Sequence, residues 1–274
     1  MSLVIKNTKA LLSPENFRLK ILVYGLPGTG KTSFAASAPN PGFGACETGH
    51  GDGLLSIADK GLDYVELANY PDLKAFCQGQ VFKDKATRVL DSLSDMARTH
   101  VKNYALSLPR RGEDSPKRKA GIPELDDYGV MGETTRQLLR DLIQQGSHVV
   151  VTATEKYQLP DPERGITEVT IGPDLPGSMF LASPAMFDVV LRLRTRSKLR
   201  DPRDAKSRYT ERYFLTENDG RGTIAKCRSN YSNKPLLDSE EIFDPASGVG
   251  TFDYMLKKIL AGYAREGRVE GAHA

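Results

Sequence analysis

The stretch that decides the fold is Gly25-Leu26-Pro27-Gly28-Thr29-Gly30-Lys31-Thr32, which directly follows an apolar run at residues 19–24. The apolar run predicts a buried strand, and the residues after it match the phosphate-binding pattern G-x-x-x-x-G-K-[ST]. The glycines let the backbone curl with its N–H groups pointing inward, and a helix that begins near Lys31 aims its positive end at the same place. This stretch therefore predicts a loop that holds a polyphosphate. The alternative is a glycine-rich turn without a ligand.

The side chains of this loop predict how the phosphates are held. We expect Lys31 to reach the β- and γ-phosphates and Thr32 to place its hydroxyl on a Mg²⁺ that bridges them. The candidate nucleotide contacts in this region are Gly25, Leu26, Pro27, Gly28, Thr29, Gly30, Lys31, Thr32 and Ser33.

The composition is that of a globular protein. With 274 residues, of which 39% are hydrophobic, we expect one α/β domain over residues 1–274, with a core at about 18–230 and a helical tail at 250–274. Cys46, Cys77 and Cys227 lack the spacing of a zinc site or a disulfide framework. No signal pattern and no apolar run of about 18 residues is present, so we expect a cytoplasmic protein without a membrane partner.

Strands and helices alternate along the first part of the chain. The patterns predict strands at 43–46, 64–67, 87–91 and 148–152, and helices at 54–60, 70–79, 92–107 and 128–145. Such alternation predicts a mainly parallel sheet flanked by helices. Sheets of this kind bind ligands beyond the carboxyl ends of their strands.

The second part of the chain has a different pattern. Residues 154–183 contain four prolines and few periodic apolar residues, which predicts a long loop. Alternating residues at 187–195 and 209–216 predict a β-hairpin, and 223–228 a further strand. Apolar residues at helical spacing predict a helix over 252–265.

Two carboxylates follow predicted strands. Asp91 ends the strand at 87–91, where a nucleotide site needs an acid to hold its metal, so we predict that Asp91 and Thr32 are the metal-binding residues. Glu47 follows the strand at 43–46, and we predict that it is the general base that orients the attacking water. The alternatives are a helix-capping aspartate and an exposed loop glutamate.

Four further residues are candidates for sensing the nucleotide. Thr152 and Thr154 end the strand predicted to lie beside that of Asp91, where they could sense the γ-phosphate; the alternative is ordinary strand threonines. Lys226 and Arg228 alternate on a predicted strand and could reach the nucleotide of a neighbouring subunit. The alternative for this pair is exposed cations on a strand face.

Basic residues gather in two segments that predict contact with single-stranded nucleic acid. The segment at 108–123, which we expect to be mobile, contains Arg110, Arg111, Lys117, Arg118 and Lys119. The hairpin connection contains Arg192, Arg194, Arg196, Lys198, Arg200, Arg203, Lys206 and Arg208. Tyr104 and Tyr128 flank the first segment and are candidates for stacking on bases. The alternatives are a solvated charged surface and core aromatics.

The order of the motifs is informative as well. It runs Gly25 to Thr32, Cys46-Glu47-Thr48-Gly49, Val89-Leu90-Asp91-Ser92-Leu93, Val149-Val150-Val151-Thr152-Ala153-Thr154-Glu155, Pro173-Asp174-Leu175-Pro176-Gly177 and Phe187-Asp188-Val189-Val190. Over residues 18–230 this order resembles phage-encoded RecA-like P-loop ATPases of the single-strand-annealing and recombination type.

The resemblance implies a RecA-type core that binds ATP, Mg²⁺ and single-stranded DNA in phage recombination or replication. It implies self-association into a ring or filament with the nucleotide at the subunit interface. A single-strand DNA-binding protein or a replication protein is a further candidate partner, and the cytoplasm would be that of a bacterium or a phage-infected host.

Individual positions also match the family. Glu47 matches its catalytic glutamate, Asp91 its Walker B acid, and Lys226-Cys227-Arg228 the Lys-x-Arg that reaches a neighbour's nucleotide. Segments 108–123 and 154–183 fall where the family has its DNA-binding loops. Thr154 departs from the family, which often has glutamine or histidine there.

Two other functions stay open. A small-molecule nucleoside or nucleotide kinase also has this phosphate loop, and the basic hairpin could imitate its lid. An ATP-gated adaptor with little turnover is the second. Glu47 together with Asp91 favours activation of water over transfer to a bound acceptor.

Overall fold

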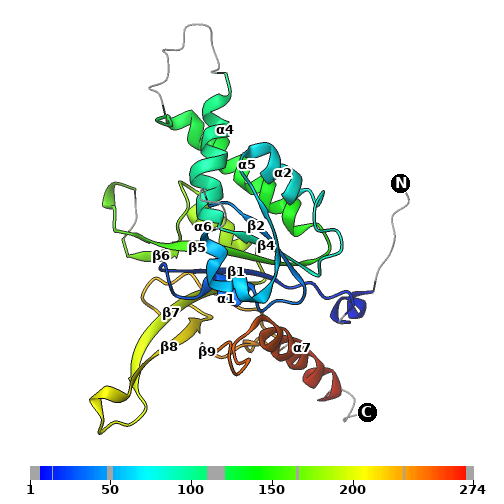
Figure 1. Ribbon diagram of the computed structural model, residues 1–274, viewed down its shortest axis with the longest axis vertical. Coiled ribbons are helices and arrows are strands. Elements are labelled where there is room, and N and C mark those ends of the chain that lie inside the picture. Colours follow the sequence, from blue (N-terminus) through cyan, green and yellow to red (C-terminus); the bar gives the residue numbers. More distant parts are fainter. Residues whose placement is uncertain are drawn as a thin grey trace.

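The structure is a computed structural model that describes residues 7–13, 15–47, 52–109, 121–164, 167–230 and 232–269. The strands are β1 (Lys20–Gly25), β2 (Pro41–Ala45), β3 (Asp63–Glu66), β4 (Thr87–Asp91), β5 (His148–Gln158), β6 (Thr170–Pro173), β7 (Val189–Leu199), β8 (Arg208–Leu215) and β9 (Glu240–Phe243). Within the described residues they form a nine-stranded sheet in the order β3-β2-β4-β5-β1-β7-β8-β9, with β6 paired to β5 outside this path (Figure 1).

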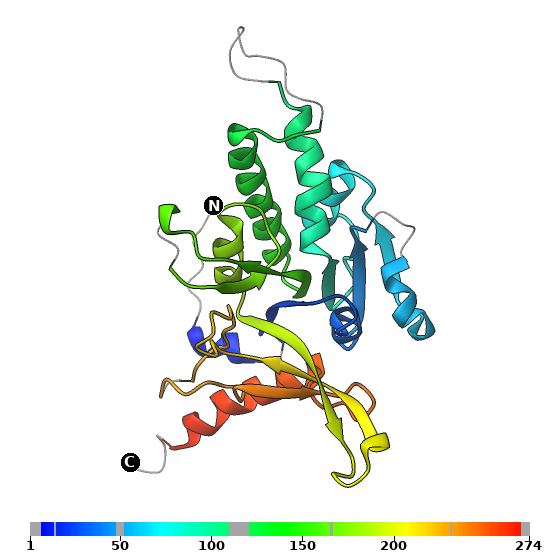
Figure 2. The same ribbon diagram turned by 90° about the vertical axis from the view of Figure 1, so that its left-hand side faces the viewer.

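Helices cover both faces of the sheet. The α-helices are α1 (Lys31–Ala35), α2 (Tyr70–Cys77), α3 (Leu93–Asp95), α4 (Lys102–Ser107), α5 (Leu125–Ile143), α6 (Met179–Ala185) and α7 (Phe252–Val269). The 3₁₀-helices are η1 (Thr8–Leu12), η2 (Asp52–Lys60), η4 (Pro162–Arg164) and η5 (Ala205–Ser207), and η3 (Met96–Val101) is a π-helical segment. Figure 2 shows α4 and α5 on one side of the sheet and α7 on the other. Among the described residues, no helix combines the length and apolarity needed to cross a membrane.

The strands β1 to β5 and β7 run parallel, whereas β7, β8 and β9 pair antiparallel. This arrangement confirms the predicted fold class, a mainly parallel sheet flanked by helices with a β-hairpin extension at its C-terminal side. The predicted strand at 87–91 is confirmed with the same bounds, and the helix predicted at 92–107 is the consecutive run of α3, η3 and α4.

Alternating residues of the central strands fill two separate cores. Leu22 and Tyr24 of β1 pack on the face covered by α2, α4 and α5. Ile21 and Val23 pack on the opposite face, with α1 and α7. Because both faces are covered, β1 reads as a continuous apolar run in the sequence.

The prediction of one long loop over residues 154–183 is wrong. The strand β5 continues to Gln158, and β6 pairs with it antiparallel, with Glu155 opposite Pro173. The helix α6 follows at residues 179–185. Proline is tolerated at the end of an edge strand, where its missing N–H costs no ladder hydrogen bond. The prolines of this segment are therefore compatible with a strand, and they did not justify the prediction of a loop.

The prediction of a strand over residues 223–228 is also wrong. The segment contacts the sheet through isolated bridges, with Thr223 opposite Ile171 and Lys226 opposite Val190. The third antiparallel strand of the extension is β9, which pairs with β8. A single bridge to β7 leaves Lys226 and its neighbours in an irregular connection.

His148 gives a pH-dependent contribution to stability that can be measured. It is buried at the start of β5, its Nδ1 accepts the Leu19 N–H at 3.0 Å, and its ring packs against Phe252. Burial, assisted by the nearby Arg18, lowers the pKa of His148 from 6.5 to about 4. Between these values the unfolded chain binds a proton that the folded chain does not, so stability falls as the pH is lowered.

We expect this histidine to cost the wild type about 2 kcal/mol of unfolding free energy between pH 7 and pH 5, since each pH unit below 6.5 corresponds to about 1.4 kcal/mol. Urea unfolding of the wild type and of His148→Asn at both pH values measures it. The free energy of unfolding of the variant should fall by about 2 kcal/mol less than that of the wild type over this pH range. Equal pH dependence in the two proteins would contradict the assignment.

Candidate nucleotide-binding site

The predicted phosphate loop connects β1 to α1 and needs glycine at three positions. Gly28 and Gly30 have φ angles of 76° and 106°, in a region that residues other than glycine rarely adopt. A Cβ atom at Gly25 would overlap with the carbonyl oxygen of Leu193 on β7. The loop therefore has the curled backbone that the motif predicts, and it also packs closely against β7.

Lys31 lies folded over this loop. Its Nζ donates to the carbonyl oxygens of Gly25 and Leu26 at 3.1 and 3.0 Å. Burial lowers the pKa of Lys31, while the carboxylates of Asp91, Glu155 and Glu47 oppose that shift. The predicted cation is thus within electrostatic range of both predicted acids.

Asp91 is held between two threonine hydroxyls. Thr32 donates to one carboxylate oxygen at 2.8 Å and Thr152 donates to the other. The side chain of Thr152 comes from β5, which lies between β1 and β4 in the sheet. Burial raises the pKa of Asp91, and the two hydroxyl bonds oppose that shift. A hydroxyl and a carboxylate side by side next to the phosphate loop are oxygen donors of the kind that Mg²⁺ prefers, so these residues fit the ion.

Glu47 lies at the end of the neighbouring strand. The Cys46 N–H donates to the Asp91 carbonyl oxygen at 2.7 Å, which places the tips of β2 and β4 together. Glu47 and Asp91 both line a small hollow there, with Gly53 among its other residues. Although the Glu47 side chain reaches solvent, partial burial raises its pKa, and Asp91 and Asp95 raise it further. The structure brings Glu47, Asp91 and Lys31 together, as the sequence predicted.

Thr154 lies beside the start of the phosphate loop, where it is opposite Gly25 in the β1–β5 register. Its N–H donates to Ser94 Oγ at 3.0 Å, and its carbonyl oxygen accepts the Asp174 N–H at 2.7 Å. We call the edge of the sheet that carries the phosphate loop, Glu47 and Asp91 the nucleotide edge. The backbone of Thr154 links this edge to the segment that begins at Asp174.

The predicted pair Lys226 and Arg228 lies away from the phosphate loop of its own chain. Arg228 forms an ion pair with Asp188, whose carboxylate also accepts the N–H of Lys20. Lys20 is the first residue of β1, and the phosphate loop follows the last. These cations are thus near the opposite end of β1, and a role in nucleotide binding by a neighbouring subunit stays a prediction.

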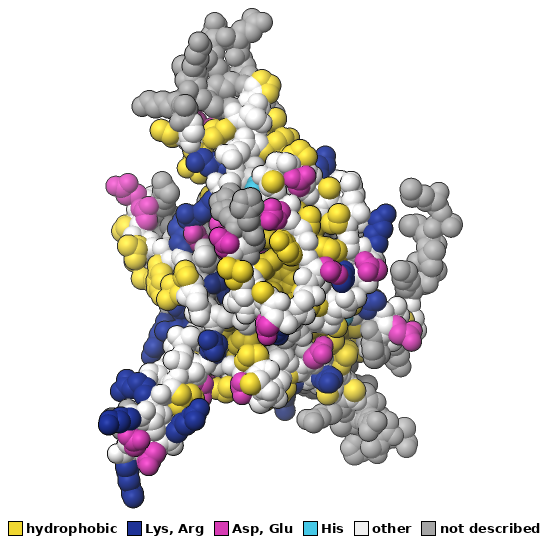
Figure 3. Space-filling view, in the orientation of Figure 1, with side chains coloured by type: hydrophobic (Ala, Val, Ile, Leu, Met, Phe, Trp, Pro, Cys, Tyr) yellow, Lys and Arg dark blue, Asp and Glu magenta, His cyan; other side chains and the backbone are white. Residues whose placement is uncertain are grey.

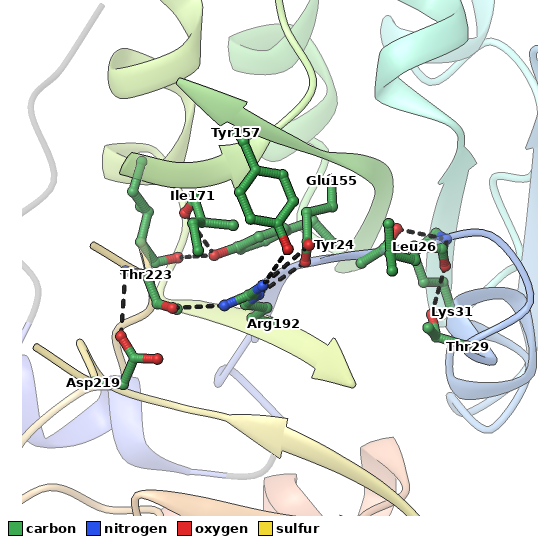
Figure 4. Close-up of polar contacts among 12 residues, drawn as sticks. Tyr24, Leu26, Thr29, Lys31, Glu155, Tyr157, Ile171, Arg192, Asp219 and Thr223 are labelled. Atoms are coloured by element: carbon green, nitrogen blue, oxygen red, sulfur yellow. Dashed lines mark hydrogen bonds and ion pairs between the residues drawn. The ribbon is translucent and has the colours of Figure 1, made fainter. Parts of the chain in front are cut away.

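A buried ion pair beside the loop was not predicted. The side chains of Arg192 on β7 and Glu155 on β5 are 3% and 2% exposed, and the guanidinium binds both carboxylate oxygens at 2.8 and 3.0 Å (Figure 4). Arg192 also donates to Thr223 at 2.9 Å and to the Tyr157 hydroxyl at 3.2 Å. Arg192 is therefore not part of a solvated basic connection. The signal in the sequence was an arginine inside an apolar strand.

Tyr24 extends this network to the neighbouring segments. Its hydroxyl hydrogen bonds with the carbonyl oxygens of Ile171 and Ile224, at 3.1 and 2.9 Å. Burial raises the pKa of the Tyr24 hydroxyl, so it stays a neutral donor. The end of β1, just before the phosphate loop, is thereby hydrogen bonded to β6 and to the 223–228 segment (Figure 4).

The two predicted basic segments have different outcomes. All five cations of the first segment, at 110–119, lie outside the described residues. Figure 3 shows Lys and Arg side chains gathered over the projecting end of the β7–β8 hairpin. Arg196 binds Glu211 at 2.6 Å and Glu240 at 2.7 Å, and Lys198 also binds Glu211. The hairpin is therefore partly neutralised by its own carboxylates.

The two candidate stacking tyrosines also differ. Tyr104 stacks on Tyr70 with ring centroids 3.8 Å apart, so one face of its ring is occupied, and its role in base stacking stays a prediction. Tyr128 is half-exposed and lines a hollow of about 580 Å³ beside α4, α5 and β5.

Comparison with known proteins gives a family and two similar folds. Residues 18–229 match the model of the family described as AAA domain. The sequence matches no curated protein. The flagellar accessory protein FlaH from Methanocaldococcus jannaschii is 12% identical, with 82% of this chain and 84% of that chain covered and a TM-score of 0.38. The KaiC-like protein PH0186 from Pyrococcus horikoshii OT3 is 16% identical, with 82% and 85% covered and a TM-score of 0.42.

The buried pair predicts a large stability effect of Arg192→Met. Removing the arginine leaves the Glu155 carboxylate buried without its partner, which costs about 3 to 5 kcal/mol in comparable pairs. Urea unfolding at pH 7 measures this loss. The double variant Arg192→Met, Glu155→Gln should recover part of it, and Arg200→Met, an exposed arginine of the same hairpin, should change stability by less than about 0.5 kcal/mol. A single variant as stable as the wild type would contradict the role of the pair.

Proposed function

We propose that this chain, which belongs to the AAA domain family and is an ATPase, binds single-stranded DNA and assists phage-type recombination, annealing or replication. The observation that carries the DNA-binding part is a basic hollow with an aromatic wall beside the ATPase site. Its lining includes Arg98, Lys102, Lys156 and Tyr128.

The proposed hydrolysis relies on Glu47. A carboxylate with a raised pKa is a better proton acceptor, and Glu47 lies at the strand tip next to Asp91, where it can orient a water toward the phosphates. Lys31 and the N–H groups of the loop would hold the phosphate chain in place.

Thr32 and Asp91 would hold the metal ion. Their oxygens lie 2.8 Å apart beside the loop, and Thr152 fixes the second carboxylate oxygen. Mg²⁺, when bound there, neutralises charge on the phosphate oxygens. Asp91 is then an orienting ligand and Glu47 the base, which separates the roles of the two carboxylates.

The basic hollow suits a phosphate backbone. Arg98 binds Asp174 at its edge, whereas Lys102 and Lys156 form no ion pair within the described part of the chain. Free ammonium groups attract phosphates and release counterions, and a half-exposed tyrosine offers a surface for base stacking. Lys156 is two residues beyond Thr154, so β5 leads directly from the nucleotide edge to the hollow.

The assembly we propose is a ring or filament with nucleotide between subunits. Lys226 and Arg228 lie near the start of β1, whereas the phosphate loop lies at its end. A role for them in nucleotide binding therefore requires a second copy of the chain. A single-strand DNA-binding protein or a replication protein is a further candidate partner. We also propose that residues 1–274 act as one domain, because Phe252 and Met255 of α7 pack in the same core as Phe34 of α1.

We expect Glu47→Gln to keep nucleotide binding and to lose at least about 100-fold in ATP turnover, since the amide cannot accept the proton. Wild-type turnover should fall on acidification with a midpoint above 4.5, the ordinary pKa of glutamate, because burial raises that of Glu47. Phosphate release measures the rate and calorimetry measures nucleotide affinity. Glu15→Gln, at an exposed position, is the matched control. Normal turnover in Glu47→Gln would remove Glu47 from the mechanism.

The DNA proposal is tested by the double variant Lys102→Gln, Lys156→Gln. We expect roughly tenfold weaker binding of a labelled oligothymidylate near 0.1 M salt, and a log–log salt slope smaller by about 1.4, because two phosphate contacts are lost. Fluorescence anisotropy at several salt concentrations measures both. The control is Lys74→Gln, Lys257→Gln, which removes the same charge from exposed positions elsewhere.

ATP turnover with and without this oligonucleotide completes the test. Stimulation by DNA that fades with salt and is lost in the hollow variant supports the proposal. Unchanged affinity and slope in that variant would contradict it. Turnover that requires a nucleoside acceptor would indicate a kinase, and nucleotide binding without turnover would indicate an adaptor.

A further inference from the structure

Arg212 on β8 lies at the nucleotide edge of the sheet. On β7, Arg192 is opposite the β1 residue Tyr24, and Thr195, three residues further along, is opposite Arg212. The position of Arg212 is therefore beyond the end of β1, where the phosphate loop begins. Because alternate residues of a strand share a face, Arg212 is on the same face as Phe214.

That face is the one covered by the helix after the phosphate loop. Phe214 packs edge to face against Phe34 of α1, with centroids 5.0 Å apart. Phe243, which is opposite Arg212 in the β8–β9 register, packs against Phe34 as well. The hairpin thus places Arg212 next to the loop from the side opposite to β4 and β5.

The arginine side chain contacts the loop at Gly30. A Cβ built at Gly30 would lie 3.4 Å from both Cδ and Nε of Arg212. The stem of Arg212 therefore lies against the loop backbone at the last glycine of the motif, which the ring of Phe243 approaches as well.

One donor of the half-buried Arg212 side chain also lacks a partner. Its Nε is buried and has no hydrogen-bond acceptor within the described residues. Glu211 on β8 and Glu240 on β9 bind Arg196 instead. A buried guanidinium donor without an acceptor is costly, and its planar set of donors matches phosphate oxygens.

We propose that Arg212 binds the α- or β-phosphate of the bound nucleotide. The γ-phosphate end is expected on the other side of the loop, near Asp91 and Glu47, because these acids are on β4 and after β2. Arg212 approaches from β8, so it meets the part of the phosphate chain nearer to the nucleoside. This inference rests on the proposed nucleotide site and adds a residue outside the phosphate-loop motif.

The test compares ADP with a non-hydrolysable imido analogue of ATP, both with Mg²⁺, by titration calorimetry on the full chain. We expect Arg212→Met to weaken both ligands by the same factor, about tenfold or more, because a charge-assisted hydrogen bond to a shared phosphate is lost. Arg208→Met, which removes an exposed arginine from the same strand, should leave both affinities unchanged. Arg212→Lys keeps the charge and should retain part of the affinity.

Each result has one meaning. Wild-type affinity in Arg212→Met overturns the proposal, and so does a loss confined to the ATP analogue, which would place the guanidinium at the γ-phosphate. If Arg212→Met unfolds, the Arg212→Lys variant decides the question. An ADP affinity closer to that of the wild type than to background supports a phosphate contact. A folded lysine variant that does not bind ADP overturns the proposal. Lys31→Ala tests the underlying site, because normal binding in that variant would remove the phosphate loop itself.

Discussion

The nucleotide edge depends on the two hydrogen bonds that Asp91 accepts from Thr32 and Thr152. These bonds join three elements: the first turn of α1 after the phosphate loop, the end of β4 and the middle of β5. The carboxylate is 8% exposed, so it is stable as an ion only with such donors around it. The same constraint fixes the distance between the loop and the strand tips, and hence the space in which phosphates and a metal ion can lie.

A buried ion pair extends this arrangement across the sheet. Glu155 follows Thr154 on β5 and binds Arg192 of β7, while Tyr24 ties the end of β1 to β6. The next residue, Lys156, lines the basic hollow. The strand β5 thus carries Thr152, the glutamate of the buried pair and the lysine we propose for DNA binding, and a shift of β5 would move all three together.

Local patterns predicted the parts of the site that a short stretch defines. The loop from Gly25 to Thr32 needs positive φ angles, and a strand that ends in Asp91 needs only an apolar run. Longer-range features were missed for physical reasons. The prolines of 154–183 are compatible with an edge strand, so composition alone could not separate β6 from a loop. The segment at 223–228 alternates like a strand, but one bridge to Val190 leaves it outside the sheet.

The sequence by itself determined the phosphate loop, the parallel strands and the two carboxylates at neighbouring strand tips, because each follows from the order of residues within a few positions. Only the tertiary structure decided which charges are buried and paired. Arg192 and Arg196 lie four residues apart on the same strand, yet one is enclosed with Glu155 and the other is near the surface with Glu211. That difference depends on partners far along the chain, and an arginine's neighbours in sequence do not specify which carboxylate the fold will bring to it.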